Sequence, residues 1–205
     1  MVTRNYRLLF GPLAGVILAF GIIGLAPLIP GYSHVHQTVS EIGEIGSPAR
    51  IPFGIMLFCV AACILMFASA VRDVSLAAHH SPFAAYLIGF MALPAAGIGL
   101  FAYPHPLHNI FGISELIGYQ APLVLALTWR SEPRAKTLVM VSWVLFAVIW
   151  STIALNLTSF APPVWVYVKP VHGLAQRALF AAWFGWCAVV GILLFQRTWH
   201  ANRRF

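Results

Sequence analysis

One stretch of the chain, Tyr32–Arg50, concentrates side chains that could do chemistry. It contains two histidines and two glutamates, including His36 and Glu41, in a protein in which only 8% of residues are charged. The flanking segments are strongly apolar. Ionisable groups gathered at one place in such a chain predict a site that binds a partner or carries out acid–base chemistry.

A second group lies on one predicted helix. His108, Gly112, Glu115 and Tyr119 follow spacings of four, three and four, which places them on one helical face. Glu115 lies roughly 10 Å from His108 along the axis, at a rise of about 1.5 Å per residue. A carboxylate within an apolar span costs several kcal/mol unless it is protonated, paired or facing water. Glu115 is therefore a candidate ligand or general acid–base group.

A third group opens the last apolar segment, where His172 and Gln176 share a face and Arg177 follows. An arginine roughly one and a half turns inside an apolar span requires an anionic partner. A lipid phosphate is one candidate, because guanidinium binds it in a forked geometry. The carboxylate candidates are Glu41, Glu44 and Glu115.

Several imidazoles accompany these groups and could bind a divalent metal such as zinc, since imidazole and carboxylate are its usual ligands. The predicted metal-binding residues are His36, His105, His108 and His172. No H-E-x-x-H pattern fixes which of them converge. The alternative is that these histidines and carboxylates hydrogen-bond the loops.

The elements that position these groups are membrane spans. The chain is 60% hydrophobic with a mean hydropathy of +0.86, which is typical of an integral membrane protein. We predict an all-α bundle of six transmembrane helices forming one domain over residues 1–205, with a kink near Pro94. Pro162 and Pro163 predict an extended turn before the last span. The predicted spans are Leu8–Leu28, Ile51–Val71, Pro82–Tyr103, Leu107–Trp129, Thr137–Thr158 and Val171–Gln196.

The basic residues predict the orientation of the bundle. If the N-terminus is cytoplasmic, nine of them lie inside: Arg4, Arg7, Arg72, Arg130, Arg134, Lys136, Arg197, Arg203 and Arg204. Three lie outside: Arg50, Lys169 and Arg177. The positive-inside rule therefore predicts that both termini are cytoplasmic and that the three polar groups share the outer face. The same rule accounts for the net charge of +7 without a nucleic-acid partner.

Short motifs carry a family resemblance. His36-x-x-x-Ser40-Glu41-Ile-Gly43 followed by Gly46-x-Pro48, with Pro104-x-x-x-His108 and Gly173-x-x-Gln176-Arg177, resembles the six-helix prokaryotic membrane family catalogued as domain of unknown function 998. The pattern is more distantly similar to Frag1/DRAM/Sfk1-type membrane proteins, some of which are linked to lipid remodelling. The resemblance implies a six-helix fold in a prokaryotic inner membrane and implies no activity.

The leading hypothesis is a lipid-interacting membrane protein with a polar pocket at the outer face, acting as a metal-assisted hydrolase or acyl-transferring enzyme. The predicted catalytic residues are Glu41, His108, Glu115 and Arg177. In this scheme a glutamate acts as ligand or acid–base group and Arg177 holds a phosphate or carboxylate. One alternative is a proton or metal-ion transporter. The other is a non-catalytic structural subunit, as a homo-oligomer or with a partner membrane protein.

Overall fold

A computed structural model describes residues 5–202, with side chains described as far as Arg197. Arg4, Arg203 and Arg204, three of the basic residues used to predict orientation, lie outside this range. The described residues form helices and no strand. The main helices are α1 (Phe10–Leu25), α2 (Arg50–Ala77), α3 (Phe83–Phe90), α4 (Ala92–Leu100), α5 (Pro106–Gly118), α6 (Ala121–Trp129), α7 (Lys136–Leu157), α8 (Pro162–Val168) and α9 (His172–Asn202).

Within the described part, six helical runs are long and apolar enough to cross a membrane, which confirms the predicted all-α transmembrane fold. Their bounds are Tyr6–Leu28, Arg50–Ala77, Phe83–Leu100, Pro106–Trp129, Pro133–Phe160 and Pro162–Arg197. The last run starts earlier than predicted. The prolines expected to hold an extended turn instead open the short helix α8, since a proline in the first turn lacks only an N–H that has no helical partner.

Two spans are broken by prolines. Pro94 cannot donate to the carbonyl of Phe90 and its ring crowds that carbonyl, so α3 ends at Phe90 and α4 starts at Ala92. This confirms the predicted kink. Pro122 acts in the same way on Gly118, where α5 ends before α6 begins at Ala121. The predicted fourth span is therefore present, but it consists of two consecutive helices.

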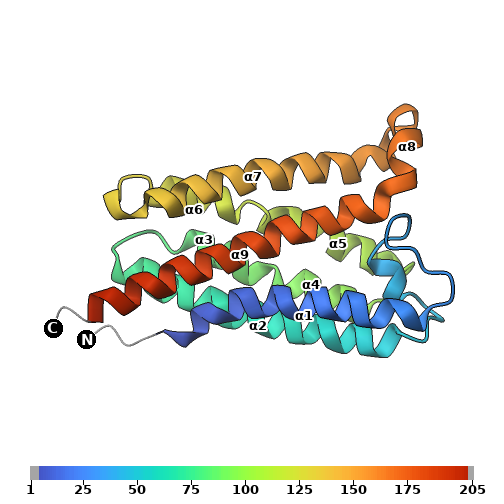
Figure 1. The fold of residues 1–205 in the computed structure, drawn as a ribbon, viewed down its shortest axis with the longest axis horizontal. Coiled ribbons are helices and arrows are strands. Elements are labelled where there is room, and N and C mark those ends of the chain that lie inside the picture. The colour runs from blue at the N-terminus through green and yellow to red at the C-terminus, as the bar shows by residue number, and fades with distance from the viewer. Residues whose placement is uncertain (1–4, 203–205) are drawn as a thin grey trace.

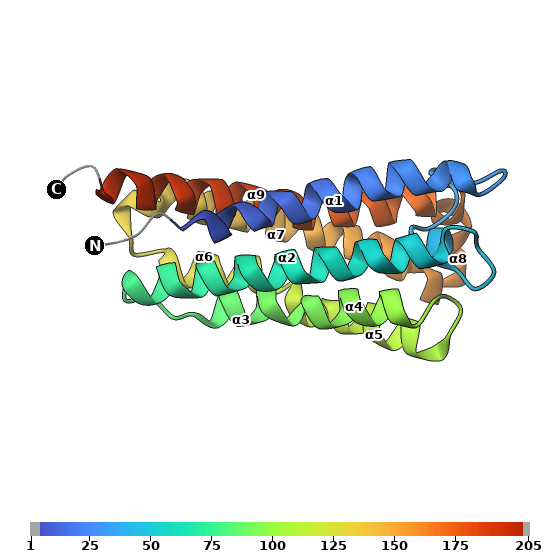
Figure 2. The ribbon, with the colours of Figure 1, turned by 90° about the horizontal axis from the view of Figure 1, so that it is seen from below.

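The spans close into one bundle (Figure 1). α1 packs against α2 and α9, α2 packs against α3 and α4, and α7 packs against α9 and α6. The described chain starts and finishes at the same end of the bundle, here called the termini end (Figure 2). The opposite end, here called the distal end, carries α8 and the loop between α1 and α2.

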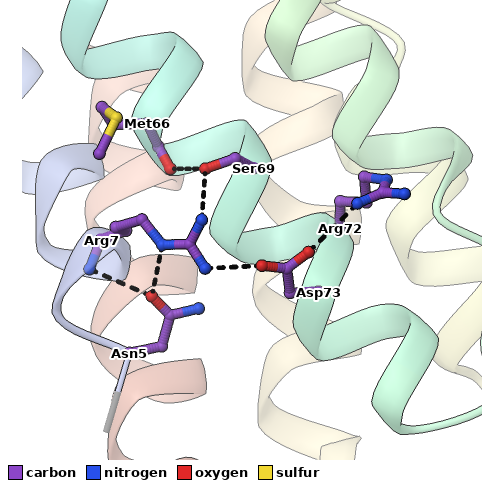
Figure 3. A network of polar contacts seen from close by, with 6 residues as sticks. All are labelled: Asn5, Arg7, Met66, Ser69, Arg72 and Asp73. Carbon is purple, nitrogen blue, oxygen red and sulfur yellow. Dashed lines mark hydrogen bonds and ion pairs between the residues drawn. The ribbon is translucent and has the colours of Figure 1, made fainter. Parts of the chain in front are cut away.

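The interior is filled from the middle of the bundle to the termini end. Trp129, Trp183 and Trp186 are buried there, and the Trp186 indole N–H donates to Ser142 Oγ at 3.0 Å. At the surface of this end, Arg7 ties the short 3₁₀ helix η1 (Tyr6–Leu9) to α2 (Figure 3). Its guanidinium donates to Asp73 Oδ2 at 2.6 Å and to Ser69 Oγ at 3.3 Å (Figure 3).

Candidate functional site

The distal half of the bundle encloses a cavity of about 550 Å³. Its walls come from α1, α2, α4, α5, α7, α9 and the loop before α2, and most of the lining side chains are apolar. Phe53, Leu57, Leu116, Leu179 and Phe180 are examples. The polar lining residues are Ser40, His108, Asn109, Glu115, Tyr119, Asn156, His172 and Gln176.

The cavity is long and reaches the middle of the bundle. His108 and Tyr119 both line it and stand eleven residues apart on the fourth span, a distance of about 16 Å along a helix axis. His172, at the start of α9, lines the distal part, and Trp183 of the same helix lines the deep part. The four residues predicted to share one face of the fourth span, His108 to Tyr119, all line this cavity.

The break at Pro122 creates the space. Beyond the break α6 packs against α7, whereas α5 packs against α4 and α3 and makes no comparable packing with α7 among the described residues. Interrupted helical backbone within a membrane is tolerated where it is buried in protein or lines a cavity. Tyr119, which lies at the break, is buried and also lines the cavity. Gly112 widens the space further, because a Cβ placed there would meet no atom within 4 Å.

Glu115 and Tyr119 form the polar centre of the deep cavity. The Tyr119 hydroxyl donates to Glu115 Oε2 at 2.8 Å, and the Tyr119 ring packs edge-on against Trp183 with centroids 5.4 Å apart. Glu115 Oε1 has no hydrogen-bond partner within the described part of the chain and is not among its fully enclosed polar atoms. The free oxygen is therefore an acceptor that a molecule in the cavity can reach.

The two cavity histidines lie nearer the distal end. His108 is only 6% exposed, and its Nδ1 lies 2.9 Å from the carbonyl oxygen of Phe101. A carbonyl only accepts, so Nδ1 carries the proton and the other ring nitrogen is an acceptor in neutral imidazole. His172 packs edge-on against Trp165 with centroids 4.8 Å apart. Both rings are positioned by the protein and can still contact cavity contents.

Arg177 contacts uncharged groups of the loop before α2 and of α9. Its guanidinium donates to the carbonyl oxygens of Gln37 at 2.8 Å and Gly173 at 2.9 Å, and to the Tyr32 hydroxyl at 2.6 Å. No ion pair joins it to Glu41, Glu44 or Glu115 in the described residues. The three carboxylate candidates were therefore wrong as partners of Arg177. Neutral oxygens accept from its two terminal nitrogens, whereas its Nε is buried and has no partner in the described chain. Arg177 does not line the cavity.

The groups around this guanidinium are uncharged near neutral pH. Burial raises the pKa of the Tyr32 hydroxyl above its ordinary value, although the hydrogen bond from Arg177 partly opposes the rise. Burial and the positive charge of Arg177 both lower the pKa of His34. Arg177 is thus a cation surrounded by neutral acceptors, and it latches the loop before α2 onto α9.

Other contacts strengthen this latch. Gln176 Oε1 accepts from the backbone N–H of Val39 at 2.6 Å. Gly173 allows the close approach, since a Cβ there would overlap the carbonyl oxygens of His34, Val35 and Gln37. The loop residues Val39 and Ser40 line the cavity, so the latched loop forms its distal cover.

Glu41 belongs to this loop and not to the cavity lining. Its Oε2 accepts from the backbone N–H of Thr38 at 2.5 Å and from the Thr38 hydroxyl at 2.8 Å. The Thr-x-x-Glu spacing is that of a capping box, in which the glutamate reaches back to the first residue. The local contact holds the turn that leads into the 3₁₀ helix η3 (Ser40–Gly43).

The four histidines predicted to bind metal are not gathered. Throughout the described chain, no group of three or more His, Cys, Asp or Glu side chains could hold a metal ion. His36 Nδ1 lies 2.5 Å from the carbonyl oxygen of Pro170. His105 accepts from the backbone N–H of Leu107 at 3.1 Å and caps α5. His36 and His105 thus hold backbone segments, while His108 and His172 line the cavity, which corrects the predicted ligand set.

The match to a protein-family model covers most of the chain. The model described as protein of unknown function (DUF998) matches residues 12–193. The chain belongs to this family. No curated protein and no solved structure matches it. The DUF998 region contains every residue that lines the cavity, from Leu18 to Phe184.

In this DUF998 chain, the structure brings three of the predicted site residues, His108, Glu115 and His172, into one cavity. It assigns loop contacts to the others: Glu41, His36, His105 and Arg177. Sequence reasoning missed the apolar walls and Pro122 as the residue that opens them. The signal for the break was available, because Pro122 stands inside a span four residues after Gly118.

Proposed function

We propose that this protein takes an amphiphilic molecule from the membrane into the distal cavity. The apolar chain lies against the leucines and phenylalanines of the walls, and the polar group reaches the Glu115–Tyr119 pair. The observation that carries the proposal is this pair of polar side chains within a largely apolar cavity of about 550 Å³. Small-molecule sites are commonly apolar clefts of this size with a few convergent polar groups.

The route into the cavity runs from the side, between α5 and α7. Ile113 of α5 and Phe160, just beyond α7, line the cavity and are also among the large exposed apolar side chains. They therefore stand at its edge, facing the hydrocarbon. The distal end is covered by the loop that Arg177 holds. A molecule dissolved in the bilayer can enter laterally without passing through water.

We further propose that both termini are cytoplasmic, on the basis of the positive-inside distribution of lysine and arginine. The cavity then opens within the outer half of the membrane. Lipids of the outer leaflet could then enter the cavity.

Binding is supported better than conduction. The polar lining ends at Tyr119, and Trp129, Trp183 and Trp186 fill the interior between that point and the termini end. A transport pathway needs polar groups that continue across the bundle. Metal-assisted hydrolysis has less support, because His36 and His105 lie in separate backbone contacts and no metal-binding cluster occurs in the described residues.

Filling the cavity tests the proposal. Gly112→Leu places a side chain in the space that the missing Cβ leaves open, and Gly185→Leu is the matched control on α9, where a Cβ also meets no atom within 4 Å. Gly185 does not line the cavity. Each variant is reconstituted in phosphatidylcholine nanodiscs and photolabelled with a diazirine-bearing hexadecanol, and the labelled residues are mapped by mass spectrometry.

The expected result is labelling of cavity residues such as Leu116 and Leu179 in the wild type and in Gly185→Leu. Gly112→Leu should lose most of this labelling while its melting temperature stays within a few degrees of the wild type, because its Cβ meets no neighbour. Undiminished labelling of these positions in a folded Gly112→Leu protein would refute the proposal.

A further inference from the structure

We infer that the cavity selects amphiphiles whose polar group is a primary ammonium over neutral or anionic amphiphiles with the same chain. This inference rests on the proposed function and names the class of molecule that the same cavity takes. It follows from two features of the lining, its ionisable side chains and its free hydrogen-bonding atoms.

The ionisable side chains of the lining favour a cation over an anion. Among the described residues that line the cavity, Glu115 is the one acidic residue, and no lysine or arginine is present. Arg177 is the cation nearest along α9, but its two terminal nitrogens are engaged by Tyr32, Gln37 and Gly173. An anionic head group would enter a site with no cation to compensate it. An ammonium would meet a carboxylate in a medium of low dielectric constant.

The free hydrogen-bonding atoms also favour a donor. Glu115 Oε1 is an accessible acceptor with no partner in the described chain. The Asn156 amide donates to the carbonyl oxygens of Thr152 at 2.8 Å and Ala175 at 3.2 Å, which leaves its oxygen available. In neutral His108 the ring nitrogen not bonded to Phe101 is an acceptor as well.

The free donors are fewer. Gln176 uses its oxygen to accept from Val39, so its amide group remains a donor. Asn109, Ser40 and the neutral ring of His172 each offer a donor and an acceptor. The indole N–H of Trp183 has no partner in the described chain, but it is fully enclosed. Acceptors therefore predominate, and the strongest of them is a carboxylate. A primary ammonium supplies three donors and the opposite charge, which neither an alcohol nor a carboxylate can do.

A competition experiment with matched head groups tests the inference. Dodecylamine, dodecanol and dodecanoate compete against the diazirine-bearing hexadecanol in phosphatidylcholine nanodiscs, and each competitor is expressed as its concentration in the bilayer. In the wild type the amine should displace the probe at a concentration about tenfold lower than the alcohol, because the alcohol supplies one donor and no charge. Dodecanoate should be the weakest competitor.

Three variants assign the preference to one side chain. Glu115→Gln should remove the advantage of the amine while the alcohol competes as before. Glu44→Gln is the control, since this carboxylate lies in the distal loop outside the cavity lining. Tyr119→Phe frees the second oxygen of Glu115 and should keep the preference, which provides a test if Glu115→Gln does not fold.

The outcomes separate the two proposals. Equal displacement by all three competitors, or loss of the preference in Tyr119→Phe, overturns the inference about the head group while the cavity remains the binding site. Absence of cavity labelling by the hexadecanol probe overturns the proposed function itself. An amine preference that survives in Glu115→Gln also overturns the inference, because the carboxylate then does not cause it.

Discussion

The two halves of the bundle are built from the same spans but differ in how tightly they are packed. From the middle to the termini end, the interior is filled by large side chains, among them Trp129, Trp186 and Leu125, each no more than 2% exposed. The distal half contains a cavity of about 550 Å³. The difference begins at Pro122, where the fourth span changes from α6, which packs against α7, to α5, which does not pack comparably in the described structure.

The difference in packing makes the distal half the more suitable place for a binding site. Helix association in a membrane depends on close packing and interhelical hydrogen bonds, so a hollow half gives up contacts that the filled half retains. The distal half is held by other means, chiefly the latch of Arg177, Gln176 and Gly173 on the loop before α2. Regions that bind ligands are commonly drawn from the less stable parts of a protein.

One substitution placed in both halves should give the largest difference. Leu125 is fully buried in the filled half, whereas Leu179 is buried but lines the cavity. Leu125→Ala should lower the free energy of unfolding by about 2–5 kcal/mol, the range for truncating a well-packed leucine. Leu179→Ala should cost clearly less, because one side of Leu179 already lacks partner atoms.

The measurement is unfolding of both variants in mixed micelles with increasing dodecyl sulfate, followed by circular dichroism. Leucine to alanine is the same chemical change in both cases, so the difference between the two free energies reports the local packing. Equal losses for the two variants would mean that the cavity does not loosen the distal half.

The next largest effect should come from the latch. Arg177→Met keeps much of the apolar stem and removes the donors to Tyr32, Gln37 and Gly173. The expected loss is about 1.5–3 kcal/mol, the range for hydrogen bonds to a charged group. The loop should also become more sensitive to added protease. Arg50→Met, at an exposed arginine of the same end, should leave both quantities unchanged.

The sequence allowed the spans to be predicted well and the site only in part. Apolar length and helical periodicity depend on local residues, so six spans and the kink near Pro94 could be read directly. The face shared by His108 and Glu115 followed from spacing for the same reason. The partners of Arg177 could not be found this way, because backbone carbonyls of a distant loop leave no mark in residue types.

The contacts of the histidines and of Glu41 were also predicted incompletely from the sequence. Ligand sets depend on which residues converge in space, and several short loops could have brought the histidines together. The structure instead uses His36 and His105 to hold backbone segments. For Glu41 a local signal did exist, since Thr38 and Glu41 have the spacing of a capping box and make its contact. The capping-box spacing was therefore a sequence signal for the contact that Glu41 makes.

The smallest change in the free energy of unfolding should come from the ion pair of Arg7 at the termini end. Arg7 and Asp73 are paired at 2.6 Å, but each side chain is 41% exposed, so water and salt screen the pair. Asp73→Asn should cost no more than about 1 kcal/mol in dodecyl sulfate unfolding, and less at high salt. Ser69→Ala, which removes a neutral acceptor of Arg7, is the control and should not respond to salt. A loss as large as that of Arg177→Met would show that the filled half depends on its arginine as strongly as the hollow half does.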